Sequence, residues 1–155
     1  MPRYNWKPLN NQQVGSYVEY FVKMELTMYG FEVYTTEVDD RGIDFVARRG
    51  RGPFIEVQVK SLRKYGYVFM QKTRFELREH VYLALALMLE GELPRLYLIP
   101  ATTWLVPNEV FVDRTYDGLK SKPEWGINIS GKNMPAIEQF SFETTIERIS
   151  HANDR

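Results

Sequence analysis

The chain has 155 residues, of which 44% are hydrophobic, so it is long enough to enclose one hydrophobic core. It contains no cysteine, which excludes disulfides, thiolate zinc sites and a cysteine nucleophile and suits a reducing cytoplasm, the compartment that we expect. Its twenty basic residues balance twenty acidic ones, and because no apolar run approaches the roughly 20 residues of a membrane span, we expect a soluble protein.

The first predicted elements are an N-terminal arm at residues 1–10, which has no periodic pattern, and a helix over residues 12–29. Gly30 is a natural C-terminal stop for that helix. Gly15 leaves space for a phosphate or a metal ion beside the carboxylate of Glu19, one turn later, although Glu19 also fits an ordinary exposed position. The helical spacing is carried by Val14, Tyr17, Val18, Phe21, Met24 and Met28.

Three strands are predicted next. Residues 31–38 form the first strand, and a turn at residues 39–42 leads into the second. Residues 42–48 and 54–60 are rich in β-branched and aromatic residues and are separated by a turn of Gly, Pro and Arg. This pattern is typical of a β-hairpin.

Strand alternation sorts the side chains of residues 54–60 onto two faces. One face carries Ile55, Val57 and Val59, and the other carries Phe54, Glu56, Gln58 and Lys60. The amide of Gln58 and the ammonium of Lys60 lie beside the carboxylate of Asp44 on the neighbouring strand. These groups are suited to a metal ion and a phosphate rather than to a hydrophobic core.

The next segments predict a strand, a helix and another strand. Residues 64–71 have the composition of a short strand. Residues 75–89 are predicted as a second helix, because they include the longest apolar stretch of the chain and are followed by Gly91. Residues 96–99 are a fully apolar run between two prolines, which indicates a central strand.

The last third of the chain has a weaker pattern. We expect a helical turn at residues 102–106, an edge strand at 110–112, a polar loop at 117–124 and a late strand at 125–129. The type of the closing element, residues 137–149, stays open. One α/β domain, with the order helix, three strands, helix and strand at its heart, accounts for the whole chain.

Positive charge is concentrated around the hairpin. Between residues 41 and 78, ten basic residues stand against three acidic ones, a local balance of +7, and the remainder of the chain carries −7. This distribution favours nucleic acid as a partner, although arginines that keep a solvated hairpin soluble would give the same balance. The expected phosphate contacts are Arg41, Arg63, Lys64, Lys72, Arg74 and Arg78. The aromatic residues among these charges, which could stack on bases or serve as core and edge residues, are Tyr65, Tyr67 and Phe69.

Four short motifs occur in order along the chain: Gly-x-x-x-Glu at residues 15–19, Gly-Phe at 30–31, Gly-Ile-Asp at 42–44 and Gln-Val-Lys at 58–60. Together they resemble the PD-(D/E)XK superfamily of restriction-endonuclease-like nucleases. The Gln-x-Lys variant resembles endonucleases of the Mrr type, and the first motifs resemble the first helix of Holliday-junction resolvases. The resemblance covers residues 13–100 and implies a mixed central β-sheet flanked by helices, in the order α-β-β-β-α-β, with residues 101–155 as an elaboration.

The resemblance implies an endonuclease that hydrolyses DNA with Mg²⁺ or Mn²⁺. Asp44 would supply an anionic ligand, Gln58 an amide oxygen and Val59 a backbone carbonyl oxygen, as in the family. Lys60 would orient the attacking water and stabilise the charge that develops on the phosphate. Nucleases of this class often act as dimers, so a homodimer is also expected.

The second acid of this site is less determined. Gln58 replaces the usual acid, so metal affinity falls unless another carboxylate compensates. We favour Glu19 because it matches the resolvase-like helix, but Glu56 stays open, either as a ligand or as a cross-strand partner of Arg48 or Arg49. The alternative function is a module with this fold that binds nucleic acid or protein without cutting. A third possibility is a structural or interaction module in which Asp44 and Lys60 form only an ion pair.

Histidine chemistry is not expected. His80 and His151 are isolated in the sequence, which argues against a histidine base and a zinc triad. We expect His80 to be an ordinary residue of the second helix.

Overall fold

The first helix has the predicted position. The computed structural model describes residues 3–37 and 41–153, with side chains as far as residue 149. Helix α1 spans Asn11–Met28, and a capping box holds its start, in which the Asn10 side chain accepts from the Gln13 amide and the Gln13 side chain accepts from the Asn10 amide. Gly30 follows the helix at a φ of +89°, a left-handed conformation that glycine adopts without strain.

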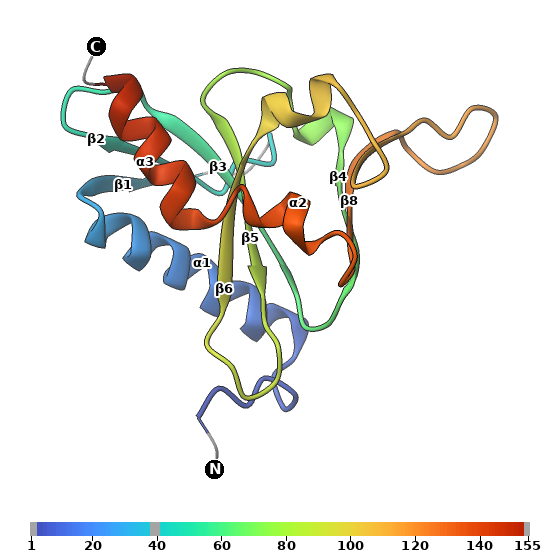
Figure 1. Cartoon of the computed structure of the whole chain (residues 1–155), viewed down its shortest axis with the longest axis horizontal. Helices are drawn as coiled ribbons and strands as arrows, with labels where there is room; N and C mark the ends of the chain where they lie inside the picture. Colours follow the sequence, from blue (N-terminus) through green and yellow to red (C-terminus); the bar gives the residue numbers. More distant parts are fainter. Residues whose placement is uncertain (1–2, 38–40, 154–155) are drawn as a thin grey trace.

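A five-stranded mixed sheet forms the centre of the molecule, in the order β1-β2-β3-β5-β6 (Figure 1). Strands β3 and β5 are parallel, and the other neighbours are antiparallel. The bounds of the strands are β1 Phe31–Thr35, β2 Phe45–Arg49, β3 Ile55–Leu62, β5 Val81–Leu87 and β6 Arg95–Pro100. The hairpin of β2 and β3 and the strand at β1 are thus confirmed, whereas the predicted turn at Asp39 and Asp40 lies outside the described residues.

The prediction of a second helix over residues 75–89 is wrong. Residues 81–87 form strand β5, which is buried on both faces, so its apolar run has no polar side that would reveal a period of two. The crossover from β3 to β5 holds strand β4, Gly66–Gln71, and a 3-10 turn, Lys72–Arg74. The order α-β-β-β-α-β therefore lacks its second helix.

Strand β6 is an edge strand and not the central strand that its sequence predicts. Its open side is covered by the segment before the last helix, where the Leu98 amide donates to the Phe140 carbonyl oxygen at 2.9 Å. The Thr145 hydroxyl donates to the Leu98 carbonyl oxygen at 2.7 Å. A covered edge is buried like a central strand, which explains the apolar sequence.

A second, three-stranded antiparallel sheet has the order β4-β8-β7. Strand β7 spans Phe111–Arg114 and β8 spans Glu124–Ile129, so the predicted edge strand and late strand are confirmed. The helical turn is a 3-10 helix, Ala101–Leu105. The closing element consists of two helices, α2 at Met134–Glu138 and α3 at Phe142–Asn153.

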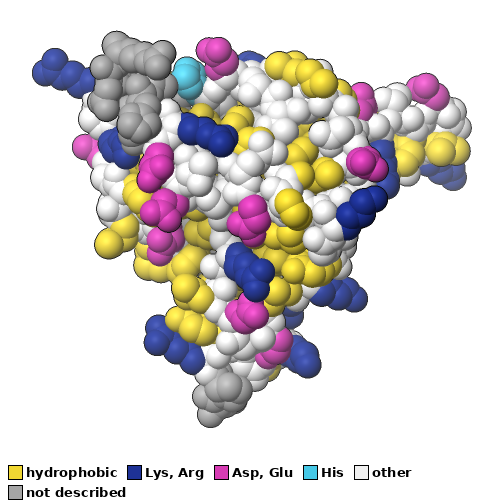
Figure 2. Space-filling model, in the orientation of Figure 1, with side chains coloured by type: hydrophobic (Ala, Val, Ile, Leu, Met, Phe, Trp, Pro, Cys, Tyr) yellow, Lys and Arg dark blue, Asp and Glu magenta, His cyan; other side chains and the backbone are white. Residues whose placement is uncertain are grey.

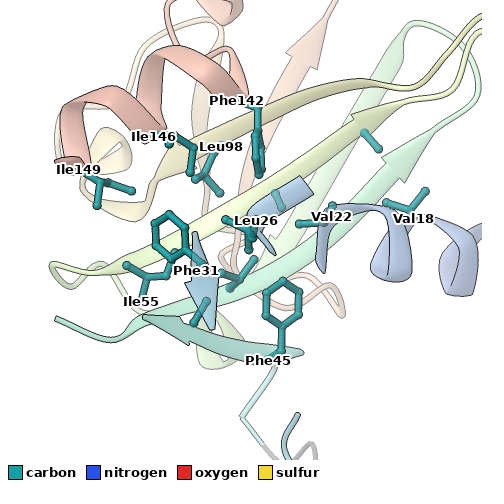
Figure 3. Packing of buried hydrophobic residues seen from close by; sticks show 14 of the residues in the cluster. Val18, Val22, Leu26, Phe31, Phe45, Ile55, Leu98, Phe142, Ile146 and Ile149 are labelled. Carbon is teal, nitrogen blue, oxygen red and sulfur yellow. The ribbon is translucent and has the colours of Figure 1, made fainter. Parts of the chain in front are cut away.

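Two hydrophobic cores lie on the two faces of the large sheet. The first core joins α1 and α3 to one face, and Figure 3 shows Val22 and Leu26 of α1, Phe31 and Phe45 of the sheet and Ile146 of α3 converging there. The second core lies between the other face, α2 and the small sheet. Each fully buried aliphatic or aromatic side chain contributes about 1.5–3 kcal/mol to stability. The predicted fold class, a mixed central sheet flanked by helices, is confirmed.

The N-terminal arm is packed against the body. Trp6 is 3% exposed, and its ring contacts Tyr17 of α1 with a centroid separation of 5.0 Å. Its amide donates to the Glu90 carboxylate and its indole N–H donates to the Glu92 carbonyl oxygen, both at 3.1 Å. These partners are more than 80 residues away, so no local pattern predicts them. None of the helices in the described part of the chain is long and apolar enough to cross a membrane.

Candidate active site

Asp44 is fixed where strands β2 and β3 separate. Their ladder ends at the pair Phe45 and Val57. One residue further, the Asp44 amide donates to the Val57 carbonyl oxygen at 2.9 Å, and Oδ2 of Asp44 accepts from the Val59 amide at 2.7 Å. The carboxylate thus replaces a backbone acceptor, which holds it against β3 next to Lys60.

The turn before Asp44 requires glycine. Gly42 has a φ of +81°, and a Cβ at this position would lie 2.4 Å from the carbonyl oxygen of Arg74. Both the conformation and the close approach exclude other residues without a shift of the backbone. The 3-10 turn that contains Arg74 therefore helps to set the position of Asp44.

An open groove of about 810 Å³ lies between the first half of α1 and the end of β3. Asp44, Val59 and Lys60 line it from the sheet, and Glu19 lines it from the helix. Four of the residues predicted for the site therefore meet in one groove. Arg63 lines it as well, so one expected phosphate contact lies beside these residues.

The helix side of the groove carries a carboxylate with open space nearby. Oε1 of Glu19 pairs with Nζ of Lys23, one turn along the helix, at 3.0 Å. A Cβ added at Gly15 would meet no atom within 4 Å. The expectation that Gly15 leaves room beside Glu19 agrees with this geometry.

Gln58 lines a different cavity. Its side chain is 9% exposed and borders a small space of about 20 Å³ together with Glu56, Arg41, Arg74 and Arg78. Oε1 of Gln58 is buried and has no hydrogen-bond partner among the described residues. The structure therefore does not bring Gln58 into the groove of Asp44, although Gln58 directly precedes Val59.

Glu56 belongs to an ion pair that the sequence did not predict. Its carboxylate accepts from Arg78 at 2.9 Å, and Arg78 also contacts Glu76 at 2.6 Å. The hydrogen bond to Glu56, and to a smaller extent the one to Glu76, raises the pKa of the Arg78 guanidinium. The predicted partners are wrong: Arg48 donates to the Gly52 carbonyl oxygen and Arg49 to the Tyr29 carbonyl oxygen.

The N-terminal arm fixes Arg63 at the end of the groove, a role that the sequence did not reveal. Arg63 donates to the Trp6 carbonyl oxygen and to Oδ1 of Asn11, both at 3.2 Å. The sequence signal that could have indicated a packed arm is its large apolar residues, Tyr4, Trp6 and Leu9, although they do not identify Arg63 as a partner.

The other expected phosphate contacts do not line the groove, and Arg41, Arg74 and Arg78 gather at the small cavity of Gln58. Lys64 is exposed in the turn before β4, and Lys72 pairs with Asp113 and lies 4.0 Å from the centre of the Trp125 ring. On the face that carries α3, acidic, basic and hydrophobic side chains are interspersed (Figure 2). The positive balance of residues 41–78 is therefore not spread as one patch over that face.

His80 is exposed and has a φ of +67° in the turn before β5, so the expectation that it lies in a helix is wrong. The side chain of His151 lies outside the described part of the chain. Among the described residues, no three His, Cys, Asp or Glu side chains gather into a group that could hold a metal ion.

The donors that are present fit Mg²⁺ better than a transition metal. Mg²⁺ takes oxygen ligands, keeps several waters and binds through one or two carboxylates. The groove offers the carboxylates of Asp44 and Glu19, and the adjacent Gln58 has an unpartnered buried amide oxygen. Among the described residues, no histidine lines the groove, so the nitrogen ligands that zinc prefers are missing from that lining.

Two solved structures share this fold. The Holliday junction resolvase Hjc of the archaeal hyperthermophile Archaeoglobus fulgidus matches with a TM-score of 0.58 and 16% identity, over 86% of this chain and 95% of that chain. The bacterial homing endonuclease I-Ssp6803I matches with a TM-score of 0.57 and 15% identity, over 94% and 97%. No protein-family model matches the chain, and no curated protein matches it in sequence. The similarity therefore shows that the chain has a fold found in nucleases.

Proposed function

We propose that the protein is a metal-dependent endonuclease that hydrolyses phosphodiester bonds of nucleic acid, with DNA as its substrate. The observation that carries this proposal is the Asp44 carboxylate, held by the Val59 amide inside an open groove that Lys60 also lines. A fold shared with a resolvase and a homing endonuclease supports the same chemistry.

The oxygen ligands come from two elements. Asp44 and Glu19 would hold Mg²⁺ or Mn²⁺ in the groove together with the Val59 carbonyl oxygen. Gln58 lines the other cavity, so its amide oxygen would join this set only after its side chain turns toward the groove. Oε1 of Gln58 has no hydrogen-bond partner in its present position, so such a turn would break no described hydrogen bond of that oxygen. A bound divalent cation would polarise the phosphodiester and lower the pKa of a neighbouring water.

Lys60 supplies positive charge beside the reacting phosphate. A preorganised cation in a partly enclosed site stabilises the charge that develops on the phosphate oxygens and orients the attacking water. Arg63, fixed by Trp6 and Asn11, binds a neighbouring phosphate without the entropy cost of ordering a free side chain. The further phosphate contacts that we propose are Arg41, Lys64, Lys72, Arg74 and Arg78. Two copies of the chain would supply one site for each strand of a duplex.

The test compares cleavage by the wild type with cleavage by Asp44→Asn and Lys60→Met, using duplex and branched DNA with Mg²⁺ or Mn²⁺. Each variant should lose at least about 100-fold in rate, the usual loss when one transition-state contact is removed. Glu147→Gln, which likewise neutralises an exposed carboxylate but lies on α3, is the control. Cleavage that persists in Asp44→Asn would overturn the proposal.

A nucleic-acid-binding module that does not cut is the second candidate. Two observations favour it: the ion pair with Lys23 reduces the negative charge that Glu19 offers to a cation, and the separation of Gln58 from the groove removes an oxygen ligand. Salt-dependent DNA binding by the wild type, with no cleavage in either metal and no calorimetric heat of Mn²⁺ binding, would support this candidate instead.

A further inference from the structure

The outer face of the small sheet carries exposed aromatic side chains. Strand β4 alternates between buried Val68 and Met70, which belong to the second core, and the outward-facing Tyr67 and Phe69. Phe69 is 47% exposed, although a phenylalanine on a soluble surface loses the free energy that burial would provide.

Tyr67 is locked in place on this face. Its hydroxyl donates to the buried Glu124, and the guanidinium of Arg114 lies 4.1 Å from the centre of its ring. A Cβ at Gly126 would lie 2.0 Å from the Tyr67 hydroxyl oxygen, so the ring lies directly on the glycine of β8. Three neighbouring strands thus hold one aromatic ring flat against the sheet.

Phe69 extends this surface. Its ring lies 6.3 Å from the ring of Tyr67 and is inclined by only 18° to it. Phe69, Tyr67 and Arg114 therefore form a strip of nearly rigid, planar groups, which we call the aromatic strip. Because Tyr67 is already ordered, a flat ligand that binds the strip has little side-chain entropy to remove.

The charge around the aromatic strip is positive. Among the described residues Arg114 makes no salt bridge. Of the nearby acids, Asp113 pairs with Lys72, Glu124 accepts from the hydroxyl of Tyr67, and Glu109, beside Asn128, is exposed. The flanking turn and loop add three exposed lysines and one exposed acid: Lys64, Lys120, Lys122 and Asp117.

We propose that the aromatic strip binds unpaired nucleotides of the substrate, with a base stacked on Phe69 and its phosphate paired with Arg114. This proposal rests on the proposed function and narrows its substrate to nucleic acid that contains a single-stranded segment. Aromatic rings mounted on a sheet offer their faces to bases, and only an unpaired base exposes its own face. The surplus of cations favours a polyanion over a neutral protein surface.

The test measures anisotropy of a labelled single strand of about eight nucleotides, without divalent metal, against an abasic strand of equal length. Phe69→Ala should weaken the Kd for the base-bearing strand by about 5- to 150-fold and leave the abasic strand unchanged. Phe54→Ala is the matched control, because Phe54 is 48% exposed and lies 5.0 Å from the guanidinium of Arg48. It should alter the Kd by less than about two-fold.

Several outcomes would overturn the proposal. Base stacking is excluded if Phe69→Ala binds as tightly as the wild type or weakens binding of both strands equally. It is also excluded if the wild type does not bind the base-bearing strand. A self-association that Phe69→Ala abolishes would assign the strip to a second copy of the chain. Phe69→Leu, which keeps an apolar side chain, should also weaken binding, and melting temperatures verify that the variants fold. This assay contains no metal and therefore does not measure cleavage. Failure of the proposed function would be seen in a different experiment, as the absence of metal-dependent cleavage.

Discussion

The carboxylate of Asp44 accepts a hydrogen bond of 2.7 Å from the backbone amide of Val59, the residue that precedes Lys60. Together with the hydrogen bond from the Asp44 amide to the Val57 carbonyl oxygen, this contact joins the segment after Gly42 to β3. It also means that Asp44 has a structural role in addition to the chemical role that we propose. Substitutions at this position must therefore separate the two.

Substitution of Asp44 by asparagine and by alanine should separate its structural role from its chemical role. Asp44→Asn keeps an oxygen that accepts from the Val59 amide, so it should retain nearly wild-type stability while it loses cleavage. Asp44→Ala leaves that amide without its acceptor and should cost about 1–2 kcal/mol in the free energy of unfolding as well. Urea denaturation measures the difference, and equal destabilisation by both variants would contradict the assigned contact.

Gly42 and Gly50 provide a matched pair for the turn before Asp44. Both have positive φ, but a Cβ at Gly50 meets no atom within 4 Å, whereas at Gly42 it meets the backbone of Arg74. Gly50→Ala should cost about 1–2 kcal/mol from the left-handed conformation alone. Gly42→Ala should cost more and should also slow cleavage, because the clash displaces Asp44. Unfolding curves and cleavage rates of the two variants test this.

Two substitutions at Gly15 test the stability of α1 and access to the groove separately. Its added Cβ would have open space, so Gly15→Ala should stabilise α1 by about 0.5–1 kcal/mol. Gly15→Leu should also fold but should raise KM for DNA, because the side chain enters the groove beside Glu19. A leucine variant with unchanged KM would show that the substrate does not enter there.

Tyr67 predicts a response to alkaline pH. Burial, and then the hydrogen bond to Glu124, raise the pKa of the Tyr67 hydroxyl above its ordinary value of about 10. A raised pKa in the folded state gives stability that is fully present below pH 10 and is lost as pH rises through the folded pKa. The stability advantage of the wild type over Tyr67→Phe should therefore shrink above pH 10, as measured by urea denaturation at several pH values. A constant difference would contradict the buried hydrogen bond.

Local periodicity predicted α1 and the hairpin of β2 and β3, because each presents one buried face. It failed at residues 81–87, where both faces of β5 are buried and no period of two is visible. Alternation grouped Gln58 with Glu56 correctly, but the cavity that Gln58 lines depends on how the 3-10 turn packs against it. The contacts of Trp6 involve residues more than 80 positions away and have no local signal.

The most direct test is the anomalous scattering of manganese in crystals soaked with Mn²⁺. A cation site in the groove predicts an anomalous peak at the Asp44 carboxylate, within coordination distance of Glu19 or of an oxygen from Gln58 or Val59, and its loss in Asp44→Asn. A fully soaked crystal with no peak at Asp44, or with a peak that persists in Asp44→Asn, would contradict a metal-dependent nuclease built on this carboxylate.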